Sequence, residues 1–193
     1  MLDEKDFAEM VEEYSRSDSV REDLIKLGRD IIKASKKIIY NTHRDDLDKA
    51  EASVKDIKKL ISKFNDIAGK SPELLYSGTY RATVQEYVEA VVYFSFVKSR
   101  KIPSRKELGV QSEPYLLGLC DLTGELVRNA ILSATKEKYS DVKLINETVE
   151  KIFNSMLQFD FRNSELRKKF DSVKYDLKKL EDLVLQLKLK DKI

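Results

Sequence analysis

The sequence is poor in the residues that metal sites and covalent catalysis most often use. Its 193 residues include one cysteine and one histidine. A single cysteine excludes an internal disulfide and a cysteine-rich zinc site. The single histidine, His43, excludes sites built from several histidines and argues against a histidine-based triad.

Helix-breaking residues and long apolar runs are also scarce. Three prolines and six glycines occur in the whole chain, which favours long helices. No apolar run is long enough to cross a bilayer, and the acidic, amphipathic N-terminus does not resemble a signal peptide. We therefore expect a soluble protein in the cytoplasm, without a membrane partner.

The composition is that of a highly charged globular chain. Hydrophobic residues make up 41% and charged residues 36%, so the chain can bury a core in a single domain over residues 1–193. The 36 basic and 34 acidic residues give a net charge of +2. Nucleic-acid binding would therefore require positive charge to be gathered on one surface.

Apolar residues recur at helical spacing along the chain, and no segment has a convincing strand pattern. The pattern predicts an all-α bundle of about seven helices. The expected helices cover residues 3–14, 19–41, 42–68, 71–100, 112–136 and 140–158, with a short turn at 104–109 and a last helix that begins at Asn163 or Ser164.

Several local signals set these boundaries. Ser71 followed by Pro72 is typical of a helix start, and Ser104 and Glu107 have the spacing of a capping box. The last helix has leucine or valine at 3-4-3 spacing, which fits either a seam between subunits or packing inside the monomer. These positions are Leu177, Leu180, Val184 and Leu187.

The segment 81–97 is apolar around its whole circumference, which predicts burial on all sides. Glu86 and Glu89 nevertheless lie side by side among these apolar residues, at i,i+3 spacing. Two adjacent buried carboxylates repel each other and lose hydration. The pair therefore predicts a compensating cation, which can be a metal ion, an arginine or a lysine.

A second acidic pair lies in the mostly apolar helix that follows Pro114. Asp121 and Glu125 share a face at i,i+4, and Gly118 leaves space one turn earlier. Two helices that each carry a carboxylate pair can enclose Mg²⁺ or Mn²⁺, which prefer oxygen ligands. Such a site suits phosphodiester chemistry.

Other interpretations of the acidic pairs stay open from spacing alone. The acids can be purely structural partners of Arg81, Arg100 or Arg128. A di-iron bundle normally needs Glu-x-x-His, which these helices lack. All-helical nucleotide pyrophosphatases also combine Glu-x-x-Glu with a second acidic pair, so RNA and free nucleotides both remain candidate substrates.

Two segments resemble the signature motifs of Trax, the translin-associated factor X of the translin superfamily. They are Gln-Glu-Tyr-Val-Glu-Ala at 85–90 and Tyr-Leu-Leu-Gly-Leu-Cys-Asp-Leu-Thr-Gly-Glu-Leu-Val-Arg at 115–128. The resemblance extends from about Val20 to the last helix. The N-terminal part keeps the family order at Arg21-Glu22, Arg29-Asp30-Ile31, Ser35-Lys36 and His43-Arg44.

This resemblance implies a translin-like helical fold and closed, hollow oligomers that hold RNA inside. It also implies a Mg²⁺- or Mn²⁺-dependent endoribonuclease whose catalytic and metal-binding acids map onto Glu86, Glu89 and Asp121, with Glu125 as a further member. Translin itself lacks the full acidic set, so the set here favours Trax. The alternative is a non-catalytic, translin-type oligomer that binds RNA or single-stranded DNA.

The chain departs from eukaryotic Trax in its length. It lacks a long N-terminal extension and the long insert between the two motifs, where Ile102 to Glu113 is short. These departures indicate a compact, archaeal-type homologue that assembles with itself. They leave open whether a translin-like subunit takes part.

Basic residues of the second expected helix are our candidates for an RNA groove, because RNA phosphates need lysine and arginine contacts. Arg29, Lys33, Lys36 and Lys37 fall nearly on one side of that helix. We add His43, Arg44 and Arg128 as RNA-binding candidates. The plainer interpretations are a solvated face for the lysines, a surface or hydrogen-bonding role for His43, and an ion pair with Glu125 for Arg128.

Overall fold

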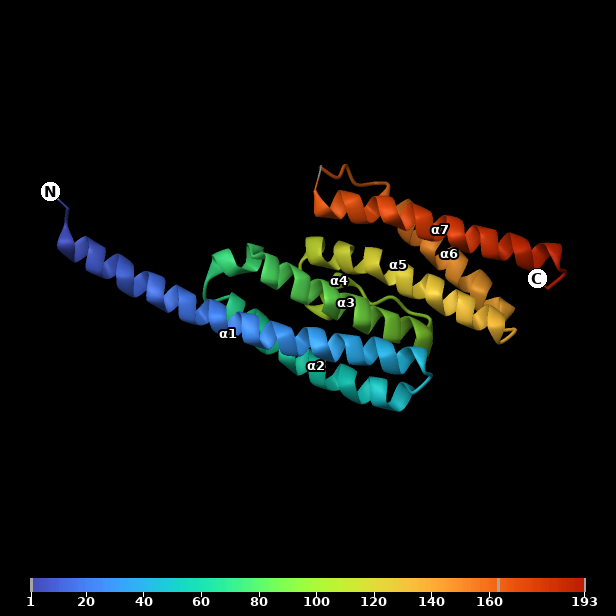
Figure 1. Ribbon diagram of the computed structural model, residues 1–193, viewed down its shortest axis with the longest axis horizontal. Coiled ribbons are helices and arrows are strands. Elements are labelled where there is room, and N and C mark those ends of the chain that lie inside the picture. The colour runs from blue at the N-terminus through green and yellow to red at the C-terminus, as the bar shows by residue number, and fades with distance from the viewer. Residues whose placement is uncertain (1, 163, 193) are drawn as a thin grey trace.

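The computed structural model describes residues 2–162 and 164–192, and none of these residues lies in a strand. They form seven α-helices and one short 3-10 helix (Figure 1), which confirms the predicted all-α class. The elements are α1 (Glu4–His43), α2 (Leu47–Ala68), η1 (Pro72–Tyr76), α3 (Gly78–Ser99), α4 (Arg105–Leu108), α5 (Ser112–Thr135), α6 (Tyr139–Met156) and α7 (Glu165–Leu189).

The first helix differs from the prediction. The segments 3–14 and 19–41, expected as two helices, form the single 40-residue helix α1. Asp3 caps its start, because the Asp3 carboxylate accepts from the backbone N–H groups of Lys5 and Asp6. No proline or glycine separates Tyr14 from Ser19, so no residue stops the helix there. The N-terminal part of α1 projects beyond the other helices in Figure 1.

The prediction that Thr42 opens a new helix is also wrong. Thr42 is in the last turn of α1, where its hydroxyl donates to the Ile38 carbonyl at 2.8 Å. The chain reverses at Asp45, whose φ of 64° is left-handed, and α2 begins at Leu47. Threonine fits a helix terminus as either an N-cap or a back-bonded final residue, and the sequence does not distinguish the two.

The caps of the later helices mostly confirm the prediction. Ser104 and Glu107 form the expected capping box of α4, and Gly109 ends this helix in the left-handed conformation. Ser164 caps α7, whereas its predicted alternative Asn163 lies outside the described residues. The start at Ser71-Pro72 gives only η1, and α3 begins after Ser77, whose hydroxyl accepts from the Tyr80 N–H.

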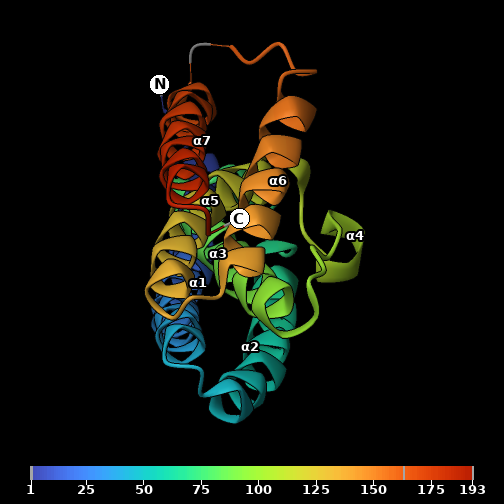
Figure 2. The same ribbon diagram turned by 90° about the vertical axis from the view of Figure 1, so that its right-hand side faces the viewer.

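Helix α3 lies inside the bundle, as its apolar circumference predicts. It packs against α1 and α2 on one side and α5 on the other (Figures 1 and 2), and α6 and α7 cover α5. Two glycines allow close approach to α3. A Cβ on Gly28 of α1 would lie 2.8 Å from the Thr83 hydroxyl, and one on Gly118 of α5 would lie 2.7 Å from the Val88 side chain.

The leucine pattern of α7 turns inward. Leu177, Leu180 and Leu187 are buried within the monomer, which favours internal packing over a seam between subunits. Within residues 2–162 and 164–192, no helix combines the length and apolarity that crossing a membrane requires.

Candidate functional site: an acidic cluster between α3 and α5

The four carboxylates singled out in the sequence come together where α3 crosses α5. Glu86 and Glu89 of α3 and Glu125 of α5 line one pocket of about 500 Å³. Asp121 of α5 lies close enough to interact electrostatically with both Glu86 and Glu89. The close approach at Gly118, one turn before Asp121, brings the two acidic pairs together.

Charge repulsion and burial perturb the two glutamates of α3. Burial, and next the carboxylates of Asp121, Glu86 and Glu125, raise the pKa of Glu89 from 4.5 to about 8. Burial also raises the pKa of Glu86, although Lys36 partly offsets this effect. No hydrogen bond or ion pair joins either carboxylate to another described side chain. Glu86 and Glu89 therefore lie partly buried beside other acids without a direct side-chain partner among the described residues.

Asp121 has two polar partners from different helices. The Gln85 amide donates to one carboxylate oxygen, and the Lys169 ammonium lies 2.5 Å from the other. Lys169 belongs to α7 and is only partly exposed, with 27% of its side chain accessible. Helix α7 therefore supplies one positive charge to the cluster across 48 positions of sequence.

Glu125 pairs with His43 at the end of α1. The His43 side chain is 6% exposed, and its Nε2 bonds to a Glu125 carboxylate oxygen. The other ring nitrogen, Nδ1, lies 2.9 Å from the Tyr93 hydroxyl. The hydrogen-bonding interpretation of His43 is thus confirmed and the surface interpretation is wrong, and Glu125 has His43 rather than Arg128 as its partner.

The donor set of the cluster suits a hard divalent cation. All four acids offer oxygen ligands, which Mg²⁺ and Mn²⁺ prefer, and a cation would offset the repulsion that raises the pKa of Glu89. With the side chains as placed, no three Asp, Glu, His or Cys side chains of the described residues converge closely enough to ligate one ion. Asp121 and Glu125 are instead directed toward Lys169 and His43.

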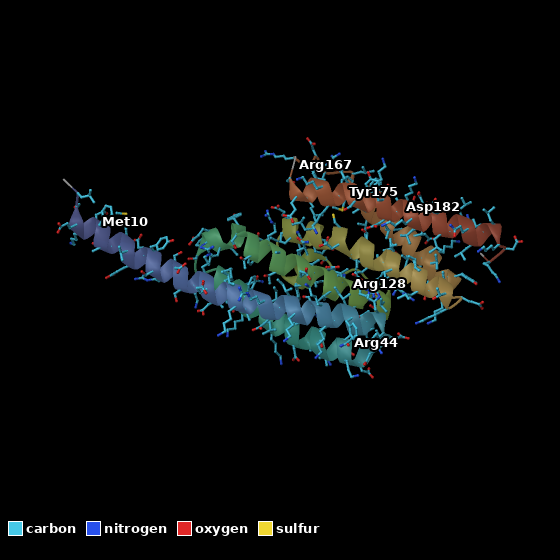
Figure 3. The ribbon with its side chains drawn as sticks, viewed as in Figure 1. Met10, Arg44, Arg128, Arg167, Tyr175 and Asp182 are labelled. Atoms are coloured by element: carbon cyan, nitrogen blue, oxygen red, sulfur yellow. The ribbon has the colours of Figure 1, made fainter. Side chains whose placement is uncertain are left out.

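The predicted basic residues divide into two groups. Lys36, Arg44 and Arg128 line the same pocket as the acids, and we call these three the basic rim. Figure 3 labels Arg44, which directly follows α1, and Arg128 on α5. Arg44 also donates to the Tyr40 hydroxyl at 3.0 Å, so both side chains stand beside the pocket.

The other predicted basic residues lie on the exposed surface of α1 and do not line this pocket. They are Arg29, Lys33 and Lys37. Arg81, which the structural interpretation paired with the acids, instead contacts Glu113 and Glu165 at 3.5 Å each.

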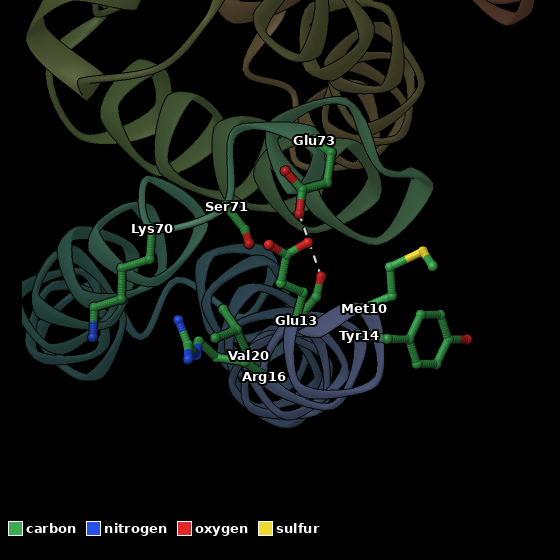
Figure 4. Close-up of a pocket in the computed structure, with 9 residues that line it drawn as sticks. Met10, Glu13, Tyr14, Arg16, Val20, Lys70, Ser71 and Glu73 are labelled. Carbon is green, nitrogen blue, oxygen red and sulfur yellow. Dashed lines mark hydrogen bonds between the residues drawn. The ribbon is translucent and has the colours of Figure 1, made fainter. Parts of the chain in front are cut away.

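A second hollow, of about 700 Å³, lies where the projecting part of α1 meets η1. Met10, Tyr14 and Val20 of α1 line it together with Glu73 (Figure 4), and Ser17 donates to Glu73 at 3.4 Å. Two acids, Glu13 and Glu73, line this hollow, and it shares no lining residue with the acidic pocket.

Sequence reasoning missed four side chains that hold the acids in place. They are Gln85, Tyr93, Asn129 and Lys169. Gln85 carries a weak signal, because it is a buried amide on an apolar helix. Lys169 carries none, since it is one member of a basic run at 167–169 and its partner lies on another helix.

The fold and site define a class of all-helical protein with an acidic pocket between two central helices. Comparison with known proteins identifies the family: the chain belongs to the Translin family, whose sequence model matches residues 19–191.

Relatives and solved structures agree with this assignment. An uncharacterised protein of Methanocaldococcus jannaschii is 31% identical over 166 residues, which are 84% of this chain and 73% of that protein. Mouse translin-associated protein X is 26% identical, over 88% of this chain and 72% of its own length. The crystal structure of apo-NeC3PO superposes with a TM-score of 0.86 and 27% identity, covering 96% of this chain and 98% of that one. An AfC3PO–duplex RNA complex has the same fold, with a TM-score of 0.84 at 23% identity and coverage of 95% and 97%.

Proposed function

We propose that this protein is a metal-dependent endoribonuclease that holds RNA against the basic rim and cleaves its phosphodiester bonds with water. The observation that carries the proposal is the meeting of four carboxylates from α3 and α5 in and beside one pocket, next to Lys36, Arg44 and Arg128. An acidic cluster beside basic side chains suits a phosphate bound through a cation.

The carboxylates and the basic rim have different roles in this proposal. Glu86, Glu89 and Asp121 would hold Mg²⁺ or Mn²⁺, and Glu125 would complete the set. Such an ion, when bound, lowers the pKa of an attacking water and stabilises charge on the phosphate. The basic rim neutralises and orients the phosphates on either side of the scissile bond. A carboxylate of the cluster accepts the proton that the water loses.

The length of the basic surface supports a polymeric substrate over a free nucleotide. Arg29, Lys33 and Lys37 continue the line of Lys36 along α1, and the stretch from Arg29 to Arg44 spans about 22 Å at 1.5 Å per residue. A strand of several nucleotides is needed to contact all of it. The similarity to translin-associated protein X and to a fold that accommodates duplex RNA supports the same choice.

The projecting part of α1 supports self-association into a closed oligomer. Phe7, Met10, Val11 and Tyr14 lie on one face at i, i+3, i+4 and i+7, and all four are exposed. An exposed apolar stripe of this kind is typical of a protein interface. Light scattering should therefore give a mass well above the 22.4 kDa of one chain, whereas a strict monomer would contradict the oligomer.

An assay with several substrates tests the proposed activity. Labelled single-stranded RNA, duplex RNA, single-stranded DNA and free NTPs are each incubated with Mg²⁺, Mn²⁺ or EDTA. We expect RNA cleavage that EDTA abolishes and that Asp121→Asn lowers at least 100-fold. The matched control is Asp182→Asn, an exposed aspartate of α7 (Figure 3), which should cleave like the wild type.

Three other results would overturn this proposal. Tight RNA or single-stranded DNA binding without cleavage would indicate a translin-type binding protein. Hydrolysis of NTPs alone would indicate a nucleotide pyrophosphatase. Activity only in the presence of a translin-like subunit would indicate an enzyme built from two kinds of subunit rather than from copies of this chain.

A further inference from the structure

The single histidine of the protein, His43, belongs to a series of hydrogen bonds that ends at the acidic cluster. His43 closes α1, Tyr93 belongs to α3, and Glu125, Asn129 and Ser133 follow one another at i, i+4 and i+8 on α5. These side chains come from three helices and meet beneath the pocket that Glu86, Glu89 and Glu125 line.

The direction of each hydrogen bond can be assigned by starting at Ser133, the end of the series opposite Glu125. The Ser133 hydroxyl donates to Asn129 Oδ1 at 3.4 Å, which leaves Asn129 Nδ2 to donate to the Tyr93 oxygen at 2.9 Å. Burial raises the pKa of Tyr93, so its hydroxyl keeps its proton and donates it to His43 Nδ1 at 2.9 Å. A neutral His43 then carries its hydrogen on Nε2, the nitrogen that contacts Glu125.

We propose that His43 is a positioning residue whose Nε2–H, fixed by Tyr93 and Asn129, holds one oxygen of Glu125 and leaves the other for a cation in the acidic pocket. This inference rests on the proposed function, in which Glu125 completes the metal-binding set. His43 is placed for this role because its imidazole is almost fully buried beside Glu125.

Burial makes this arrangement specific. With 6% of its side chain exposed, His43 has little access to water, and its ring packs against the Tyr93 ring with 4.8 Å between centroids. The hydrogen bond from Tyr93 and the contact with the Glu125 carboxylate therefore both favour the proton on Nε2, and little solvent competes. Outer partners of this kind commonly change metal affinity 10- to 100-fold when removed.

The first test reads the protonated nitrogen directly. Because His43 is the single histidine, a ¹⁵N-histidine-labelled protein gives one pair of ring nitrogens in long-range ¹H–¹⁵N spectra, without metal or RNA. We expect the proton on Nε2 in the wild type, and in Tyr93→Phe a shift of the Nδ1 resonance, because that nitrogen loses its hydrogen bond while Glu125 still accepts from Nε2–H. Tyr175→Phe, an exposed tyrosine of α7, is the matched control and should leave the spectrum unchanged.

The second test measures Mn²⁺ affinity by calorimetry or by EPR. His43→Leu should weaken Mn²⁺ binding about 10-fold. His43→Gln should restore most of the affinity, since its amide can still donate to Glu125. If circular dichroism shows that His43→Leu does not fold, Tyr93→Phe is measured instead. We expect Tyr93→Phe to bind Mn²⁺ about 3-fold or more weakly than Tyr175→Phe does.

The outcomes separate this inference from the proposed function. A wild-type proton on Nδ1, or a spectrum that Tyr93→Phe does not change, would overturn the assigned network. Unchanged Mn²⁺ affinity in both His43→Leu and Tyr93→Phe would overturn the positioning role. A wild type that has the Nε2 tautomer but binds no Mn²⁺ would refute the metal site, and with it the role of His43 toward a cation, while the orientation of Glu125 would stand.

Discussion

Glu89 should make the stability of the protein depend on pH. Its pKa in the folded protein is raised to about 8, whereas the unfolded chain titrates near the ordinary value of 4.5. Between about pH 5 and pH 8 the folded protein therefore holds a proton that the unfolded chain has released. By proton linkage, the contribution of Glu89 lowers the free energy of unfolding as the pH rises through this window.

Replacement of Glu89 by glutamine removes this titration and keeps the shape of the side chain. A pKa rise from 4.5 to about 8 corresponds to about 5 kcal/mol, because each pKa unit is worth about 1.4 kcal/mol. Glu89 lines a pocket that solvent reaches, and its ionisation depends on the charges of the neighbouring acids, which reduces the effect. We expect the stability difference between Glu89→Gln and wild type to grow by about 2 kcal/mol, in favour of the variant, from pH 5 to pH 8.5.

The assay is urea unfolding in EDTA, followed by circular dichroism at fixed protein concentration. Glu150→Gln, an exposed glutamate of α6, is the matched control and should show no such change with pH. Saturating Mn²⁺ should reverse the order at pH 7.5, because the wild type then gains binding energy that Glu89→Gln lacks. An equal difference between variant and wild type at pH 5 and pH 8.5 would refute the reasoning.

Three further predictions concern packing, assembly and the cysteine. Gly118→Ala should lower the free energy of unfolding, measured in urea, by about 2 kcal/mol, because the new Cβ would overlap the Val88 side chain of α3. Gly124→Ala on the same helix is the control and should be neutral or stabilising, because the nearest atom to its Cβ would lie 3.9 Å away. Replacing Val11 and Tyr14 together by glutamate should lower the oligomer mass in light scattering, and an unchanged mass would show that this stripe is not an interface. Cys120, whose pKa burial raises to about 12, should react with a thiol reagent only after unfolding, and rapid native labelling would contradict its burial.

Much of the helical architecture can be predicted from the sequence, because its causes are local. The apolar circumference of 81–97 predicts the central position of α3, and the capping box at Ser104 predicts α4. The prediction fails where one local signal has two meanings. Thr42 fits a helix start and a helix end equally well, and the polar stretch 15–18 breaks the apolar pattern without stopping α1.

In the acidic cluster, too, some features can be predicted from the sequence and others cannot. Spacing along two helices brings Glu86 beside Glu89 and Asp121 beside Glu125, so each pair can be recognised in the sequence. The partners of these acids cannot, since Lys169 and His43 lie 48 and 82 positions from the acids they contact. Ion pairs between helices depend on which faces meet, and helical periodicity does not specify that.

The sequence by itself determined that this protein is helical, which faces of its helices are buried and that acids lie on two of them. These properties follow from interactions within one or two helical turns. Only the tertiary structure decided that Gly118 brings α5 against α3, that Lys36, Arg44 and Arg128 stand beside the acids, and that His43 turns inward to Glu125. These contacts arise from packing between helices, where charge and burial are set by residues far apart in the chain.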